Sequence, residues 1–95
     1  MTKSIICNDK RCFICGTENN IHIHHLIYGS ANRKKSEEDG LWVYLCGKHH
    51  NLSAEGVHYN KALDLRFKKM AEKRWIDFYG KSEESFIKRY GKNYL

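Results

Sequence analysis

The chain has 95 residues, a length that fits one domain with a modest apolar core, and chains of this size are often reinforced by a metal or by disulfides. Lysine and arginine outnumber aspartate and glutamate 17 to 11, which favours a polyanionic partner such as nucleic acid over an acidic one. No stretch approaches the ~20 apolar residues of a membrane span, and the N-terminal residues contain no apolar run of signal-peptide length. We therefore expect a cytoplasmic protein with no membrane partner.

The sequence shows no linker between domains. Proline is absent and no segment is low in complexity, so residues 1–95 are interpreted as a single domain. The composition and pattern of the sequence change at about residue 58. The first part is turn-rich and carries the cysteines and histidines, whereas the remainder has a helical pattern.

The first part predicts a short hairpin. CFICG at 12–16 is typical of a tight turn, and NIHIH at 20–24 alternates apolar and polar residues as a half-buried strand does. Residues 26–40 are polar and predict a loop. LWVYL at 41–45 is the expected partner strand and leads directly into Cys46.

The second part predicts two helices. The first begins after a candidate N-cap, Asn60, and ends at Gly80, while the second runs from Ser82 to Gly91. Helical spacing places a set of apolar residues on one face of the first helix, and core packing is favoured for it over a base-stacking platform. This set is Leu63, Phe67, Met70, Ala71, Trp75 and Phe78.

Two turns of similar spacing predict a structural zinc site. Cys12 and Cys15 form one C-x-x-C turn, and Cys46 and His49 form a second turn with the same spacing. Three thiolates and one imidazole suit tetrahedral zinc, and a reducing compartment makes a disulfide framework improbable. The alternatives are a thioredoxin-like redox pair, which lacks a strand before it, and ordinary buried cysteines. Cys7 has a poor spacing for a zinc turn and is interpreted as a free or partly buried thiol.

The order of these motifs resembles the HNH endonucleases of the ββα-metal class, especially the small phage and prophage forms. The resemblance covers about residues 11–60 and depends on the C-x-x-C turn, HHLIYGSANRKKS and LCGKHHNLSAEGVHYN. It implies an α+β fold, namely a small zinc-stapled ββα-metal (HNH) domain followed by C-terminal α-helices over about 60–95. It also places the protein in a bacterial or phage-infected host cell.

The resemblance implies roles for the remaining histidines. His25 becomes the general base that accepts a proton from the attacking water, and His24 and His50 become ligands of a catalytic divalent metal (Mg²⁺, Mn²⁺, Ni²⁺ or Zn²⁺). His58 has no counterpart in the short family pattern, but His58 and Asn60 could complete the metal shell or hold a phosphate. The alternative is that the strand histidines are solvated and that His50 replaces His49 on zinc.

One departure from the family pattern concerns an asparagine before the second strand, which braces the loop in many members. Gly40 and Leu41 occupy that place in this chain. Asn32 or Asn51 could substitute, and the bracing role stays unassigned.

The segment SANRKKS at 30–36 is expected to contact DNA beside the histidines. Arg33, Lys34 and Lys35, with Asn32, would contact the phosphate backbone without reading sequence, and Tyr28 would stack on a base or sugar. A solvated charged loop is the alternative interpretation.

The sequence therefore predicts a metal-dependent DNA endonuclease with a structural Zn²⁺, leaving a 5′-phosphate and a 3′-hydroxyl as the resemblance implies. Its partners would be DNA and a phage or host DNA-processing protein, and a homodimer would be one route to double-strand cuts. The competing classes are a non-catalytic zinc module that binds nucleic acid or protein, and a purely structural zinc protein.

Overall fold

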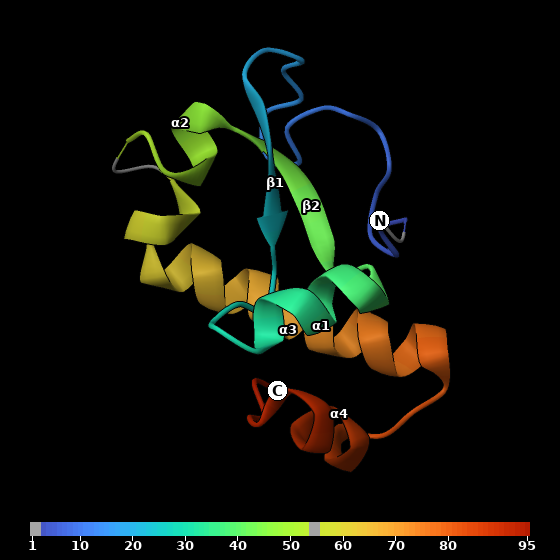
Figure 1. The fold of residues 1–95 in the computed structure, drawn as a ribbon. Coiled ribbons are helices and arrows are strands. Elements are labelled where there is room, and N and C mark those ends of the chain that lie inside the picture. The colour runs from blue at the N-terminus through green and yellow to red at the C-terminus, as the bar shows by residue number, and fades with distance from the viewer. Residues whose placement is uncertain (1–2, 54–55) are drawn as a thin grey trace.

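The computed structural model describes residues 3–53 and 56–95 and has two strands and several helices (Figure 1). Chain order is β1 (Ile21–His25), α1 (Asn32–Asp39), β2 (Trp42–Cys46), α2 (Gly47–His50), the 3-10 turn η1 (Val57–Tyr59), α3 (Lys61–Tyr79) and α4 (Glu83–Tyr90). The molecule is therefore a small α+β fold, as the sequence predicts at this coarser level. No helix among the described residues is both long and apolar enough to cross a bilayer.

The two strands form an antiparallel sheet at the centre of the molecule. Ile21 pairs with Cys46 at one end and His25 pairs with Trp42 at the other. The helices α1 and α2 lie at opposite ends of this hairpin (Figure 1). This register places the cysteine that ends β2 beside the start of β1, so both turns of the expected zinc site are close together.

The prediction of a loop over residues 26–40 is wrong for its second half, which forms α1. This helix ends at Gly40, whose φ of 74° is left-handed and whose N–H donates to the Ser36 carbonyl. Its apolar periodicity is weak because its residues are almost all polar, so sequence pattern does not reveal it. Tertiary contacts hold it instead, including a hydrogen bond from the buried Ser36 hydroxyl to the Ile27 carbonyl.

The two C-terminal helices have the predicted limits. The Asn60 side chain accepts from the Leu63 N–H at the start of α3, and the Ser82 side chain accepts from the Ser85 N–H at the start of α4. Phe67, Ala71 and Trp75 are buried as expected, but Phe78 is 52% exposed, so the apolar face ends one turn earlier than predicted. The apolar core joins these helices to the sheet. Its members outside α3 include Leu26, Ile27, Leu41, Val43, Leu45, Phe86 and Tyr90.

Asp39, the last residue of α1, ties three helices together. Its carboxylate accepts from the Trp75 indole N–H at 2.8 Å, from the Tyr90 hydroxyl at 2.7 Å and from two nitrogens of Arg89. Its backbone carbonyl also accepts from the Tyr79 hydroxyl at 2.7 Å. A single short side chain thus links α1 to both α3 and α4 through charge-assisted hydrogen bonds.

Glu72 anchors the C-terminal residues from the middle of α3. The residue is fully buried, and its Oε1 accepts from the Tyr94 N–H at 2.6 Å. Its Oε2 is buried without a hydrogen-bond partner within the described part of the chain. Burial raises the pKa of Glu72, and the nearby Glu83 raises it further.

The Asp39 cluster predicts a large effect of Asp39→Ala. The substitution leaves the Arg89 charge and the Trp75 and Tyr90 donors without their acceptor, so we expect the free energy of unfolding to fall by about 3 kcal/mol. Urea unfolding of the zinc-loaded protein measures this. Glu38→Ala is the matched control, because the exposed Glu38 makes only a 3.4 Å contact with the same arginine. Equal losses in the two variants would contradict the role given to Asp39.

The raised pKa of Glu72 predicts a pH-dependent difference between Glu72→Gln and the wild type. Because its pKa is raised, Glu72 holds its proton more tightly in the native state than in the unfolded chain. The native state therefore loses stability as the pH rises from about 4, where an unperturbed glutamate ionises, through the raised pKa. Glutamine cannot ionise, so the melting temperature of Glu72→Gln minus that of the wild type should increase over this range. Glu84→Gln, on the exposed surface of α4, controls for the loss of one negative charge. A difference that stays flat with pH would refute the assignment.

Candidate functional site

The first cysteine turn is held against the edge of β2. The Cys12 N–H donates to the Thr17 carbonyl at 2.8 Å, and the Gly16 N–H donates back to the Cys12 carbonyl. Gly16 has a φ of 76°, a left-handed conformation that glycine adopts without strain. The Phe13 N–H then donates to the Tyr44 carbonyl at 2.8 Å, so this turn is hydrogen-bonded to β2 close to its end.

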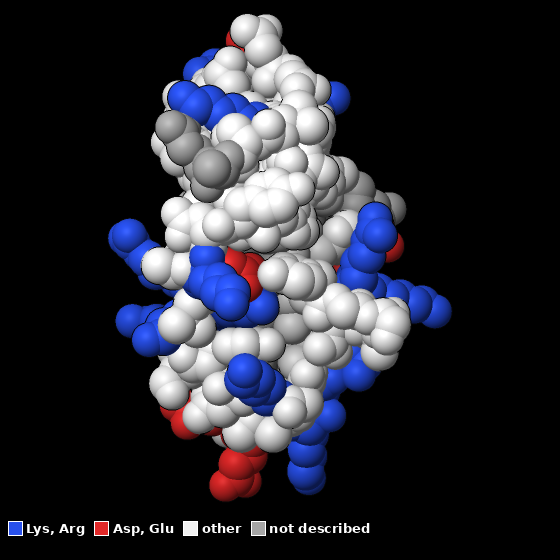
Figure 2. Space-filling model, turned by 90° about the vertical axis from the view of Figure 1, so that its left-hand side faces the viewer, with Lys and Arg blue, Asp and Glu red and all other residues white. Residues whose placement is uncertain are grey.

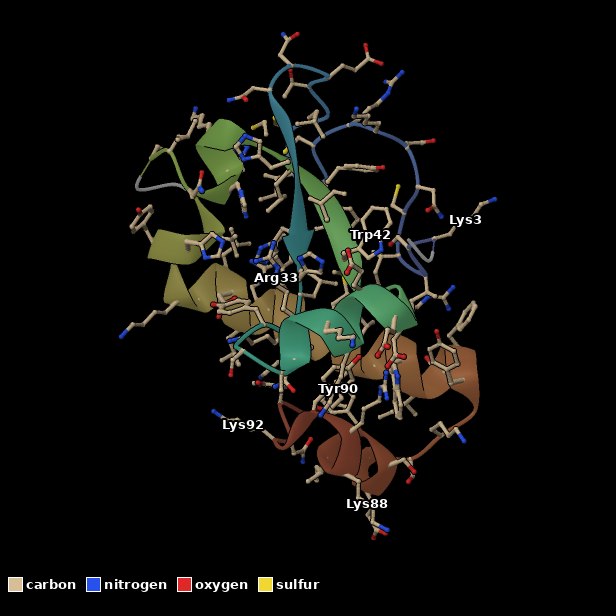
Figure 3. All side chains as sticks on the ribbon, viewed as in Figure 1. Lys3, Arg33, Trp42, Lys88, Tyr90 and Lys92 are labelled. Atoms are coloured by element: carbon tan, nitrogen blue, oxygen red, sulfur yellow. The ribbon has the colours of Figure 1, made fainter. Side chains whose placement is uncertain are left out.

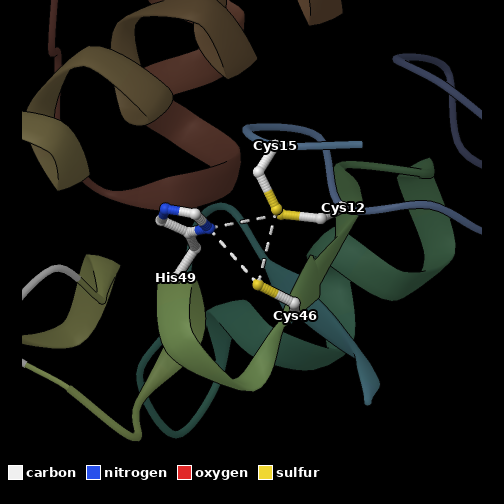
Figure 4. A group of neighbouring side chains, drawn as sticks. All are labelled: Cys12, Cys15, Cys46 and His49. Carbon is white, nitrogen blue, oxygen red and sulfur yellow. Dashed lines mark hydrogen bonds between the residues drawn. The ribbon is translucent and has the colours of Figure 1, made fainter. Parts of the chain in front are cut away.

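Four side chains from the two turns converge at that point (Figure 4). The His49 Nδ1 lies 3.3 Å from the Cys46 Sγ and 3.7 Å from the Cys12 Sγ, and the Cys15 Sγ lies 3.8 Å from the Cys46 Sγ. All four ligand atoms are within 4.8 Å of one another. The group therefore brings together the four residues that spacing alone predicts.

The group has the donor set of a structural zinc site and could hold such an ion. Burial raises the pKa of Cys12, but backbone N–H groups of Cys46, Cys15 and Ile14 together outweigh it and lower the value to about 6. The Cys12 thiolate is therefore readily formed near neutral pH. Cys7 is half-buried and lies outside the group, as predicted.

A second group contains His24, His50 and His58. One nitrogen from each lies within 4.8 Å of the others, a spacing that could hold a metal ion. The Nε2 atoms of His50 and His58 are 3.0 Å apart. His24 is 2% exposed, and its Nε2 is buried with no hydrogen-bond partner among residues 3–53 and 56–95. A buried imidazole nitrogen that lacks a protein partner fits a ligand better than a packing residue.

The electrostatics favour neutral imidazoles at His24 and His50. Burial lowers the pKa of His24 to about 3, and the neighbouring His50 and His58 add to the effect. Burial likewise lowers the pKa of His50 to about 4, with His58 and His22 as the next causes. Neutral imidazole is the form that ligates a metal.

A pocket of about 500 Å³ opens beside the three-histidine group. The end of β1 supplies His24 and His25, the following turn supplies Tyr28, and α1 supplies Arg33. Figure 3 labels Arg33 where α1 approaches the end of β1. Metal-ligand candidates, a candidate base and a cation therefore share one concave surface.

His25 has a neighbour that sequence reasoning missed. Its Nε2 is buried and lies 3.8 Å from the Glu37 Oε1, an ion-pair distance longer than a hydrogen bond. Burial lowers the pKa of His25 and Arg33 lowers it further, whereas Glu37 acts in the opposite direction. Only a helix at 32–39 turns Glu37 toward β1, so a loop prediction could not have found it.

The residues expected to contact DNA divide into two sets. Tyr28 and Arg33 line the pocket, and Lys34 is exposed on α1. In contrast, the Asn32 amide donates to the Tyr90 carbonyl at 3.0 Å and the Lys35 ammonium donates to the Arg89 carbonyl at 2.6 Å. Helix formation turns this second set toward α4, away from the histidines.

Neither candidate for the bracing asparagine lies just before β2. Asn32 contacts α4, and Asn51 is an exposed residue at the end of α2. The Asn60 side chain caps α3 by accepting from the Leu63 N–H. A Cβ on Gly40 would lie 2.3 Å from the Lys3 carbonyl oxygen, so the close approach of the N-terminal segment leaves no room for an asparagine there.

Positive charge is spread over one face of the molecule (Figure 2). In the face drawn in Figure 2, lysine and arginine side chains occupy several patches, whereas aspartate and glutamate occupy fewer. This distribution agrees with the net charge of +6.

Comparisons with protein-family models, with curated proteins and with solved structures found no match to this chain.

The Cys/His group predicts that Cys46→Ser removes bound zinc and unfolds the hairpin. Zinc binding contributes on the order of 10 kcal/mol to the folding of small zinc domains. Losing that contribution would exceed the free energy of unfolding expected for a chain of this size. Metal analysis and circular dichroism of the purified variant measure both effects. Cys7→Ser is the matched control, since Cys7 lies outside the group. A Cys46→Ser variant that keeps its zinc and its fold would exclude the assignment.

Proposed function

We propose that this protein is a metal-dependent DNA endonuclease of the HNH type. The observation that carries the proposal is the pocket in which His24, His50 and His58 converge beside His25 and Arg33. The sequence resemblance supplies the reaction type, and the geometry supports it by bringing the expected metal ligands and the expected base to one surface.

The three-histidine group suits a particular class of ion. Its donors are all imidazole nitrogens, which favour Zn²⁺, Ni²⁺ and related transition metals over Mg²⁺, an ion that prefers oxygen ligands. When bound, a divalent ion would supply positive charge to the phosphate oxygens and to the leaving oxygen. Three protein ligands leave coordination positions for the substrate.

His25 is the proposed general base. Its Nε2 is directed toward Glu37 and is shielded from solvent, so we assign proton acceptance to Nδ1. The attacking water transfers a proton to this nitrogen as its oxygen bonds to phosphorus and the bond to the 3′-oxygen breaks. The lowered pKa of His25 keeps the imidazole neutral, and therefore able to accept a proton, near neutral pH.

Arg33, at the pocket, is the proposed contact for the phosphate that reacts, and the exposed Lys34 would contact a neighbouring phosphate. Tyr28 is 36% exposed, and its ring lies 4.5 Å from the Lys68 ammonium. That cation and the ring together offer a surface for a sugar or base. These contacts position the backbone and carry no sequence information.

The test is cleavage of supercoiled plasmid by the zinc-loaded protein with Mn²⁺, Ni²⁺ or Mg²⁺. We expect metal-dependent nicking that EDTA stops and that His25→Ala reduces by about 10²- to 10⁴-fold, the usual contribution of a general base. Zinc content and plasmid binding should stay unchanged in this variant, because His25 belongs to neither group of metal ligands.

Lys92→Ala is the matched control for loss of a surface side chain, since Lys92 lies after α4, away from the pocket (Figure 3). Nicking that survives His25→Ala would exclude His25 as the base. A zinc-loaded protein that binds plasmid without cutting it in any of these metals would instead identify a nucleic-acid-binding module.

A further inference from the structure

His22, the first histidine of β1, lies outside the three-histidine group but contacts it. Its Nδ1 is 3.0 Å from the Nδ1 of His50, and its Nε2 is 3.2 Å from the Oδ1 of Asn20. Asn20, His22 and His50 therefore form a continuous chain of hydrogen bonds. Sequence spacing assigns no role to either Asn20 or His22.

The proton positions in this series of hydrogen bonds follow from the Asn20 side chain. The Asn20 oxygen can only accept, so the Nε2 of His22 carries the hydrogen. In a neutral imidazole the other nitrogen is then an acceptor, so the Nδ1 of His50 must donate to the Nδ1 of His22. His50 is left with a lone pair on Nε2, the atom that lies 3.0 Å from the Nε2 of His58.

Asn20 makes further contacts besides its hydrogen bond to His22. It has a φ of 52°, a left-handed conformation that asparagine tolerates better than most residues, and its carbonyl accepts from the Gly47 N–H at 3.0 Å. A Cβ on Gly47 would lie 2.4 Å from the Asn20 Nδ2, so the amide fits closely against the start of α2. The helix that carries His50 is therefore the same helix that positions Asn20.

We propose that Asn20 and His22 are positioning residues that hold His50 in the tautomer whose Nε2 is free to bind a divalent metal. This inference rests on the proposed function in taking the three-histidine group as a metal site. A ligating histidine commonly donates its second N–H to such a partner, and loss of the partner lowers metal affinity by about 10- to 100-fold. His22 would supply that partner through its Nδ1, which lies 3.0 Å from the Nδ1 of His50.

The first measurement is the tautomer of His50, read from long-range ¹H–¹⁵N correlations of the imidazole ring. The sample is the full chain with its structural zinc and no second metal, at pH 8, where an ordinary histidine is neutral. In the wild type we expect the proton on Nδ1. In His22→Phe, which keeps a ring but has no acceptor, the proton should move partly or wholly to Nε2. His22→Gln, with an amide oxygen as acceptor, should restore the wild-type tautomer at least in part.

The second measurement is a calorimetric titration of the same zinc-loaded proteins with Ni²⁺. His22→Phe should bind Ni²⁺ about 10- to 100-fold more weakly than the wild type, with His22→Gln in between and zinc content equal in all three. Asn20→Gly, which suits the left-handed backbone but lacks the acceptor, should weaken binding, whereas Asn20→Asp should preserve it.

A wild-type His50 that carries its proton on Nε2, or equal Ni²⁺ affinities in the wild type and His22→Phe, would overturn the inference. Those outcomes leave nicking by the wild type unaffected, so the proposed function could survive them. Conversely, the expected tautomer and affinities in a protein that cuts no DNA would support the inference and reject the nuclease. A wild type that binds no Ni²⁺, Zn²⁺ or Mn²⁺ at this group would reject both.

Discussion

The convergence of two short turns on one point is the constraint on which the hairpin depends. Cys12 and Cys15 precede β1, Cys46 ends β2 and His49 lies in α2, so an ion held by all four would close the open end of a two-stranded sheet. A hairpin of two five-residue strands is marginal by itself in water. A structural metal at this group would supply stability that the small core would otherwise lack.

The same constraint reaches the candidate site because His49 and His50 are adjacent. One faces the Cys/His group and the other faces His24 and His58. Fixing His49 therefore restricts α2 and with it the direction of His50. The hydrogen bond from the Gly47 N–H to the Asn20 carbonyl adds a second restraint on this helix. The two groups of candidate ligands thus meet at one corner of the fold.

The opposite end of the hairpin is organised by α1. Asp39 links this helix to Trp75 of α3 and to Arg89 and Tyr90 of α4, so the C-terminal helices position the basic segment as well as completing the core. The helical geometry of α1 directs the side chains of this basic segment to different sides. Arg33 points to the pocket and Glu37 approaches His25, while Lys35 contacts α4. A nuclease site built in this way would depend on helices that bear none of its ligands.

Local spacing was sufficient to predict the strands, both C-terminal helices with their caps and the four residues of the Cys/His group. These features depend on neighbours a few residues apart, where turn geometry and hydrogen-bonding side chains act directly. Spacing and resemblance also singled out His24, His50 and His58, but their common location depends on the pairing of β1 with β2 and on the path from α2 to η1. The helix at 32–39, the approach of Glu37 to His25 and the Asn20–His22–His50 chain were beyond sequence reasoning. Each depends on contacts between residues distant in the chain, which no local periodicity records.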